Sequence, residues 1–144
     1  MTFSKRSEPF SVQLGDELPQ REFKPDNVQL FLYNAILWNA HRIHFDETYT
    51  TEVEGYPGLV IAGPMIGDWL HQCVEDWLGK KGRLVSMEYS NRIAAYIGET
   101  LHYGGNVIAL DSDSQEARVE VFIKNEAGKI VAPGEATVLF ANKE

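Results

Sequence analysis

The segment from Pro64 to Gly79 constrains the fold more than any other part of this 144-residue chain. Proline suits the first position of a helix, where its missing N–H would have no partner, and glycine commonly follows the last helical residue. Between them, apolar residues recur at helical spacing: Ile66, Trp69, Leu70, Cys73, Val74, Trp77 and Leu78. We therefore expect a long helix whose apolar stripe is wide enough to be wrapped by a sheet.

The second half of the chain has the composition and periodicity of β-strands. The segments that we expect to be extended are residues 84–96, 99–110, 118–124 and 129–141. Residues 125–128 (Asn-Glu-Ala-Gly) predict a hairpin turn, and Pro133-Gly134 predicts a bulge in the returning strand. A long helix followed by an antiparallel meander predicts an α+β fold in a single domain, residues 1–144.

A shorter helix is predicted near the N-terminus, after a polar opening in which only residues 10–12 and 21–23 suit short extended pieces. Asp26 or Asn27 can cap this helix. Its apolar residues recur at i, i+3, i+4 and i+7, which predicts one buried face. That face consists of Val28, Phe31, Leu32 and Ala35. We expect the helix to end near Trp38, directly before a strongly polar segment.

Residues 39–46 (Asn-Ala-His-Arg-Ile-His-Phe-Asp) place two histidines, an arginine, an amide and a carboxylate within eight positions. Histidine titrates near neutral pH and suits proton transfer. Residues 54–64 follow about ten positions later, contain the rigid Tyr56-Pro57-Gly58 and end in Gly63-Pro64. The start of the long helix presents backbone N–H groups and the positive end of its dipole to a developing anion. Together these segments indicate chemistry on a carbonyl compound.

Residues 39–46 and 54–64 resemble the MaoC-type hydratases of the hot-dog fold, and more narrowly the branch related to mitochondrial 3-hydroxyacyl dehydratase and mesaconyl-CoA hydratase. The resemblance implies a single hot-dog domain with a long central helix wrapped by an antiparallel sheet. It implies reversible hydration of a 2-enoyl-CoA thioester to a 3-hydroxyacyl-CoA, with no metal and no other cofactor. It also implies an active site at or near the interface of two hot-dog units.

The resemblance further implies that His44 is the general acid/base and that the Gly63 backbone N–H binds the thioester oxygen. Asn39 stands where the general motif has an acidic residue, so we expect Asn39 to orient the water while His44 removes and returns the proton. Ala62 stands where the family usually has histidine, and we expect this difference to affect which substrate is bound more than which reaction occurs. The residues expected to bind substrate are His41, Arg42, Tyr56 and Pro64.

Two other functions stay open. A hot-dog acyl-CoA thioesterase often uses a carboxylate on the central helix, for which Asp68 or Glu75 would serve. A catalytically silent acyl-CoA-binding subunit of a hydratase would be consistent with Asn39 and Ala62. Release of free thiol separates the thioesterase from the hydratase, and binding without turnover identifies the silent subunit.

Some polar residues near His44 also have structural interpretations. Arg42 is as often half of a structural ion pair as a ligand for phosphate. Asp46 can simply cap the turn after the cluster. His41, His44 and Asp46 are competent metal ligands, but the chain has no second ligand cluster with suitable spacing, so acid/base chemistry is the favoured interpretation.

The composition limits the classes of molecule that the chain is expected to bind. The net charge of −8 and the lack of a basic cluster argue against nucleic acid and anionic membranes, and no apolar run approaches a membrane span. The single Cys73 excludes a disulfide framework and a multi-cysteine zinc site, and its place in the apolar stripe argues against a reactive thiol. We expect a cytoplasmic protein that binds an acyl-CoA substrate and forms a homodimer or a larger homo-oligomer.

Overall fold

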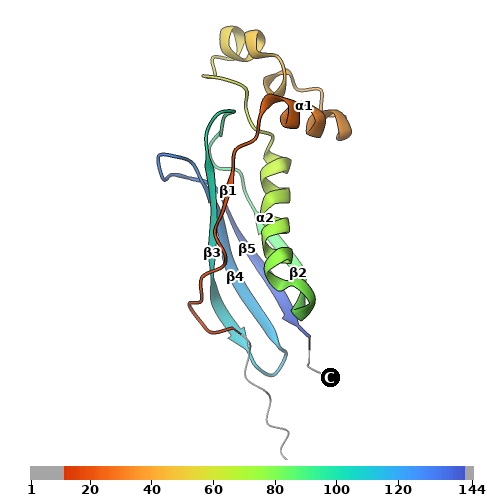
Figure 1. The fold of residues 1–144 in the computed structure, drawn as a ribbon, viewed down its shortest axis with the longest axis vertical. Coiled ribbons are helices and arrows are strands. Elements are labelled where there is room, and N and C mark those ends of the chain that lie inside the picture. Colours follow the sequence, from red (N-terminus) through yellow and green to blue (C-terminus); the bar gives the residue numbers. More distant parts are fainter. Residues whose placement is uncertain (1–11, 142–144) are drawn as a thin grey trace, which may run out of the picture.

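A five-stranded antiparallel sheet curls around one long helix in the computed structural model, which describes residues 12–141 (Figure 1). The strands are β1 (Arg21–Phe23), β2 (Gly82–Tyr89), β3 (Leu101–Asp111), β4 (Glu116–Lys124) and β5 (Ile130–Phe140), in the order β1-β3-β4-β5-β2. The helices are α1 (Asn27–Ile36) and α2 (Gly63–Leu78), with short helical turns η1 (Arg42–His44), η2 (Tyr49–Val53) and η3 (Gly79–Lys81). This arrangement confirms the predicted α+β class with a long helix wrapped by an antiparallel sheet. A single domain over residues 1–144 stays a prediction.

Helix α2 buries the stripe that the sequence predicts. Its predicted apolar residues are all buried except Trp77, which is half-buried at the C-terminal end. Gly79 ends the helix with φ of +51°, a left-handed conformation that glycine adopts without a steric penalty. On the other side of the core, the inward residues of β4 alternate with exposed or half-buried ones, as the period-2 pattern predicts. Burial of these two faces against each other fixes the helix on the sheet.

The predicted bulge at Pro133-Gly134 is wrong, because both residues pair with β4 in register. The irregularity lies nearer the hairpin, where Val131 is the extra residue between Ile130 and Ala132. Proline is tolerated here because the polar backbone groups of Pro133 face β2 and not β4. Its carbonyl accepts from the Ser90 N–H, just beyond the last β2–β5 pair, so the missing N–H interrupts no hydrogen bond to β4. The hairpin at residues 125–128 is confirmed by the bond from the Asn125 N–H to the Lys129 carbonyl.

The strand predicted over residues 84–96 is shorter than expected. Strand β2 ends at Tyr89, and residues 90–96 form a connection that runs back past the start of α2. Tyr96 in this connection forms an isolated antiparallel bridge with Val60. The connection therefore brings a late part of the sequence next to the residues that precede α2. Of the short extended pieces, 21–23 is β1, whereas most of 10–12 lies outside the described residues.

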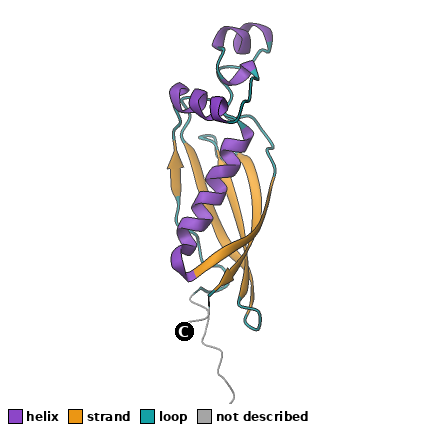
Figure 2. Cartoon of the chain, turned by 90° about the vertical axis from the view of Figure 1, so that its right-hand side faces the viewer, coloured by secondary structure: helices purple, strands orange, loops and turns teal. Residues whose placement is uncertain are grey.

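Helix α1 forms where predicted but presents the opposite face to the protein. Asp26 caps it by accepting a bond from the Gln29 N–H at 2.8 Å, and the helix ends at Ile36 rather than at Trp38. Leu30 and Asn34 are its buried residues. The predicted apolar face is exposed, with Val28, Phe31 and Leu32 each 53–59% accessible. Figure 2 shows the reason: α2 fills the sheet, and α1 lies outside it, at the end of the molecule where α2 begins.

No helix within residues 12–141 combines the length and apolar character needed to cross a membrane.

Candidate active site

His44 is the best-defined polar side chain of the cluster. It lies at the end of η1, only 7% exposed, with Nδ1 2.7 Å from the backbone carbonyl oxygen of Val60. A carbonyl oxygen can only accept, so Nδ1 carries the hydrogen and donates it. In the neutral ring, Nε2 is then the basic nitrogen, and it has no hydrogen-bond partner among the described residues. The geometry thus selects one tautomer and leaves a free base.

The Val60 carbonyl that orients His44 is itself held by backbone hydrogen bonds. The Val60 N–H donates to the Ile43 carbonyl at 3.0 Å, next to His44 in the chain. The Ile97 N–H donates to the Leu59 carbonyl at 3.0 Å, which ties this segment to the connection after β2. A backbone ladder rather than a mobile side chain therefore sets the orientation of the imidazole.

The surroundings of His44 favour its neutral form. Burial lowers its pKa below the usual 6.5, the neighbouring His41 acts in the same direction, and the bond to the Val60 carbonyl partly opposes them. The two imidazole rings meet edge to face, with centroids 5.6 Å apart. A lowered pKa leaves His44 neutral near pH 7, which is the state a general base requires.

The start of α2 leaves one backbone donor unused. Ala62 is the N-cap, and its carbonyl accepts from the N–H groups of Met65 and Ile66 at 3.0 and 3.3 Å. Pro64 has no N–H, and the Gly63 N–H has no acceptor within residues 12–141. Val60, which orients His44, lies three residues before Gly63. One short segment thus carries both the partner of the base and the free donor at the positive end of α2.

Asn91 also belongs to this site, although no sequence pattern predicted it there. A Cβ placed on Gly63 would collide with Nδ2 of Asn91 and would lie 3.1 Å from its Cγ. The backbone of Asn91 is fixed because its neighbours Ser90 and Arg92 donate to β5 carbonyls at 3.1 and 2.8 Å. The Asn91 amide has no hydrogen-bond partner among the described residues. Its NH₂ group is a second uncommitted donor beside Gly63.

The spacing of Gly63 and Gly67 is the sequence signal that points to this contact. Residues four apart share one face of a helix, and a face without side chains admits close neighbours. Here Gly63 receives Asn91, and Gly67 is in contact with the hydroxyl of Tyr89. The spacing of the two glycines predicts that another part of the chain packs closely against this face of α2. Only the fold shows which residues do so.

Asn39 and Arg42 are held by local contacts. Oδ1 of Asn39 accepts from the His41 N–H at 3.1 Å, so its NH₂ group is the part left to meet a water. Arg42 pairs with Asp46 at 2.8 Å and lies 4.0 Å over the ring of Tyr49. The structural interpretation of Arg42 as half of an ion pair is therefore confirmed.

Asp46 also caps the turn that follows the cluster, as predicted, because its Oδ1 accepts from the Tyr49 N–H at 3.0 Å. Tyr56 is half-buried beside the ring of Tyr96, and Pro64 is exposed in the first turn of α2. The assignment of His41, Arg42, Tyr56 and Pro64 to substrate binding stays a prediction.

The carboxylates considered for a thioesterase lie on α2. Asp68 accepts from the Tyr33 hydroxyl at 2.6 Å, and Glu75 is exposed. Burial and the bond to Asp68 raise the pKa of Tyr33, so this hydroxyl keeps its proton. Burial also raises the pKa of Cys73 to about 11, as expected for an unreactive thiol.

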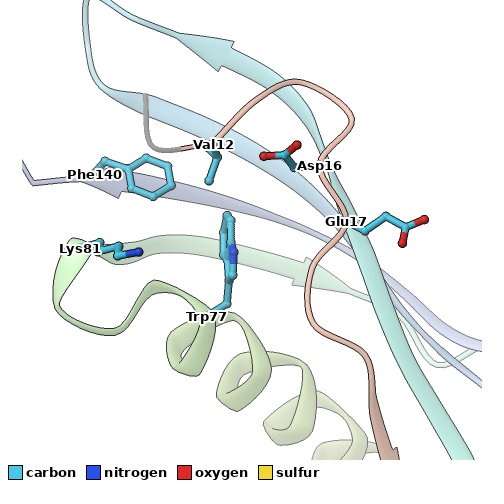
Figure 3. Close-up of a pocket in the computed structure, with 6 residues that line it drawn as sticks. All are labelled: Val12, Asp16, Glu17, Trp77, Lys81 and Phe140. Carbon is cyan, nitrogen blue, oxygen red and sulfur yellow. The ribbon is translucent and has the colours of Figure 1, made fainter. Parts of the chain in front are cut away.

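A separate cavity of about 330 Å³ lies at the far end of α2 (Figure 3). Its lining residues are Val12, Asp16, Glu17, Trp77, Lys81 and Phe140. The Trp77 and Phe140 rings meet there edge to face, 6.0 Å apart. Because this cavity lies at the opposite end of the helix from Gly63, it is not part of the His44 site. Within residues 12–141, His41, His44 and Asp46 belong to no group of metal-ligand type that could hold an ion.

A family model described as hydroxyacyl-thioester dehydratase type 2 matches residues 2–97, the part that holds His44, Gly63 and Asn91. The chain belongs to this family. It is also 50% identical over 46 residues to the mesaconyl-C(4)-CoA hydratase of Chloroflexus aurantiacus, an alignment that covers 32% of this chain. The alignments to its curated relatives span only 16–28% of their lengths.

Solved structures confirm the hot-dog fold. The (R)-hydratase from A. caviae superposes with a TM-score of 0.83 at 17% identity, over 91% of this chain and 98% of that one. The ChsH1-ChsH2 complex from Mycobacterium tuberculosis gives a TM-score of 0.80 at 17% identity, over 92% of this chain and 100% of the matched one. The resemblance to MaoC-like hydratases inferred from the sequence is thereby confirmed at the level of family and fold.

Proposed function

We propose that this hot-dog protein is a hydro-lyase that reversibly adds water to a 2-enoyl-CoA thioester. The observation that carries the proposal is the His44–Val60 hydrogen bond, because it fixes a neutral imidazole with Nε2 as a free base. The segment that begins at Val60 leads, three residues later, to Gly63, whose N–H is unused. The reaction requires a base and an anion-stabilising donor, and here the segment that orients the base also carries the donor.

In the proposed mechanism, Nε2 of His44 takes a proton from a water molecule as the water oxygen bonds to C3 of the substrate. The electron pair of the C2–C3 double bond shifts toward the thioester, and negative charge develops on its oxygen. The Gly63 N–H and the NH₂ group of Asn91 donate to that oxygen. The His44 imidazolium then returns the proton to C2, which completes the 3-hydroxyacyl thioester and restores the neutral base.

Asn39 supports this scheme without carrying a proton. Its Oδ1 is engaged with the His41 N–H, which leaves its NH₂ group to hold the attacking water by its oxygen. The scheme uses one base for both transfers, and it needs no metal or redox cofactor. Among carriers, CoA is favoured over an acyl-carrier protein because a chain of net charge −8 repels an acidic partner. We further propose that the protein acts as a homodimer.

The test is mass spectrometry of thioesters incubated with the purified protein, using crotonyl-, mesaconyl-, itaconyl- and longer 2-enoyl-CoA. We expect a gain of one water, lowered about 10²–10⁴-fold in rate by His44→Ala. His71→Ala is the matched control, since His71 also bonds a backbone carbonyl through Nδ1, at 2.8 Å from Gly67, on another face of the fold. Release of free CoA instead would establish the thioesterase, and acyl-CoA bound without turnover would establish the silent subunit.

A further inference from the structure

Tyr89, the last residue of β2, packs its ring on a glycine of α2. A Cβ placed on Gly67 would collide with Oη and Cζ of Tyr89 and would lie 2.8 Å from Cε1. The ring therefore occupies the space that a side chain at position 67 would need. We infer that Tyr89 is a positioning residue: its ring sets how β2 and its connection lie on α2, and thereby places the Asn91 amide on Gly63. The effect on turnover rests on the proposed function, whereas the placement of Asn91 can be measured without turnover.

The contacts of Tyr89 and Asn91 with α2 have matching spacings. Both residues beside Asn91 donate to β5 carbonyls, at 3.1 and 2.8 Å, so the chain stays extended beyond Tyr89. Two residues of extended chain span about 6.6 Å. The glycines that receive these side chains, Gly67 and Gly63, are four residues apart and span about 6 Å along α2. The two contacts thus lie side by side, and a ring that leaves Gly67 shifts the amide on Gly63.

The backbone of Tyr89 is fixed to the sheet. Tyr89 forms the last pair of β2 with β5, opposite Gly134. A Cβ on Gly134 would lie 3.2 Å from the Cβ of Tyr89 and 3.0 Å from the Glu88 carbonyl oxygen, so the glycine gives Tyr89 room beside β5. Anchored on β5 and packed on Gly67, the side chain acts as a spacer between the sheet and the helix.

The ring of Tyr89, and not its hydroxyl, accounts for this spacing. Oη has no hydrogen-bond partner among the described residues, so no polar contact holds the ring in place. Without Oη, Cζ still fills the space over Gly67. Tyr89→Phe should therefore keep Asn91 in place, whereas Tyr89→Ala should release it.

Tyr89 acts on the reaction only through Asn91. Gly67 lies about 6 Å further along α2 than Gly63, beyond hydrogen-bond reach of an oxygen bound to the Gly63 N–H. The Asn91 amide is the nearer group, since a Cβ on Gly63 would lie 3.1 Å from its Cγ. A group misplaced by about 1 Å can cost about 100-fold in rate. We expect Tyr89→Ala to lower kcat about 10–100-fold with KM nearly unchanged.

The first experiment measures the contact itself by NMR, as the NOE between the Gly63 Hα protons and the Asn91 side-chain NH₂. The NOE should be present in the wild type and in Tyr89→Phe, and it should be lost in Tyr89→Ala. Gly67→Ala is the second variant, because its Cβ pushes the intact ring off α2 while alanine favours the helix, and it should lose the NOE as well. A wild type without this NOE, or variants that keep it at full strength, would overturn the inference.

The second experiment is a double-mutant cycle on kcat, with whichever thioester is hydrated. In the Asn91→Ala background, Tyr89→Ala should cost less than about twofold, because no amide is left to position. An equal cost in both backgrounds would identify a merely structural role and overturn the inference. If no thioester is hydrated, an NOE lost in Tyr89→Ala and Gly67→Ala still supports the placement, and only the proposed function fails.

Discussion

The substitution Gly63→Ala separates catalysis from stability at the start of α2. The added Cβ would collide with Nδ2 of Asn91 and approach its Cγ to 3.1 Å, so the Asn91 amide must move. The amide is the end of an exposed side chain, and its displacement costs little. Gly63 is helical without a positive φ, so alanine should gain part of the roughly 0.5–1 kcal/mol by which it exceeds glycine in helices. The net change in unfolding free energy should stay within about 1 kcal/mol.

Activity should respond much more strongly. The Cβ stands beside the N–H that is proposed to bind the thioester oxygen, and it also displaces the second donor, Asn91. Loss of one such donor typically lowers kcat about 10²–10³-fold, or about 2.7–4 kcal/mol. We therefore expect Gly63→Ala to lower kcat about 100-fold or more with nearly unchanged stability.

The assay is the decrease of enoyl-thioester absorbance with crotonyl-CoA, or with whichever panel member is hydrated, alongside urea unfolding. Gly58→Ala is the matched control, because a Cβ on Gly58 meets nothing within 4 Å. Asn91→Ala should lower kcat on its own while leaving Gly63 unobstructed. A Gly63→Ala enzyme with kcat within about threefold of wild type would refute the role of this N–H, since a lost donor costs far more.

Two further predictions concern titration and the alternative carboxylate. Because burial holds the pKa of His44 below 6.5, kcat/KM should stay level as the pH falls through 6.5 and should decline only below the folded-state pKa. At pH values between the folded-state pKa and 6.5, His44 binds more protons in the unfolded chain than in the folded one. The unfolding free energy should therefore fall as the pH is lowered through this window. His44→Asn should reduce this pH dependence, measured by urea unfolding. Asp68→Asn should retain hydration activity, because Asp68 is engaged in a hydrogen bond with Tyr33. If the wild-type protein instead releases free thiol from the thioester and Asp68→Asn abolishes that release, the thioesterase is favoured.

Sequence patterns predicted the elements whose specification is local. The cap at Asp26, the proline and glycine that bound α2, its apolar stripe and the hairpin at 125–128 depend on residues a few positions apart. The arrangement of His44 and Gly63 could also be predicted from the sequence, because only residues 45–62 separate them and the family resemblance covers that stretch.

What the sequence by itself determined is therefore the set of helices and strands, the hot-dog class and the motif containing His44. Tertiary structure alone decided which side of α1 is buried, because periodicity marks an apolar face but cannot show that α2 already fills the sheet. It also decided that Asn91 lies on Gly63, since a contact across 28 residues depends on how β2 and its connection pack. Helix caps, turns and apolar periodicity depend on residues that are neighbours in the chain. Which side of a helix is buried, and which distant residues come into contact, depends on the space that the rest of the fold leaves free.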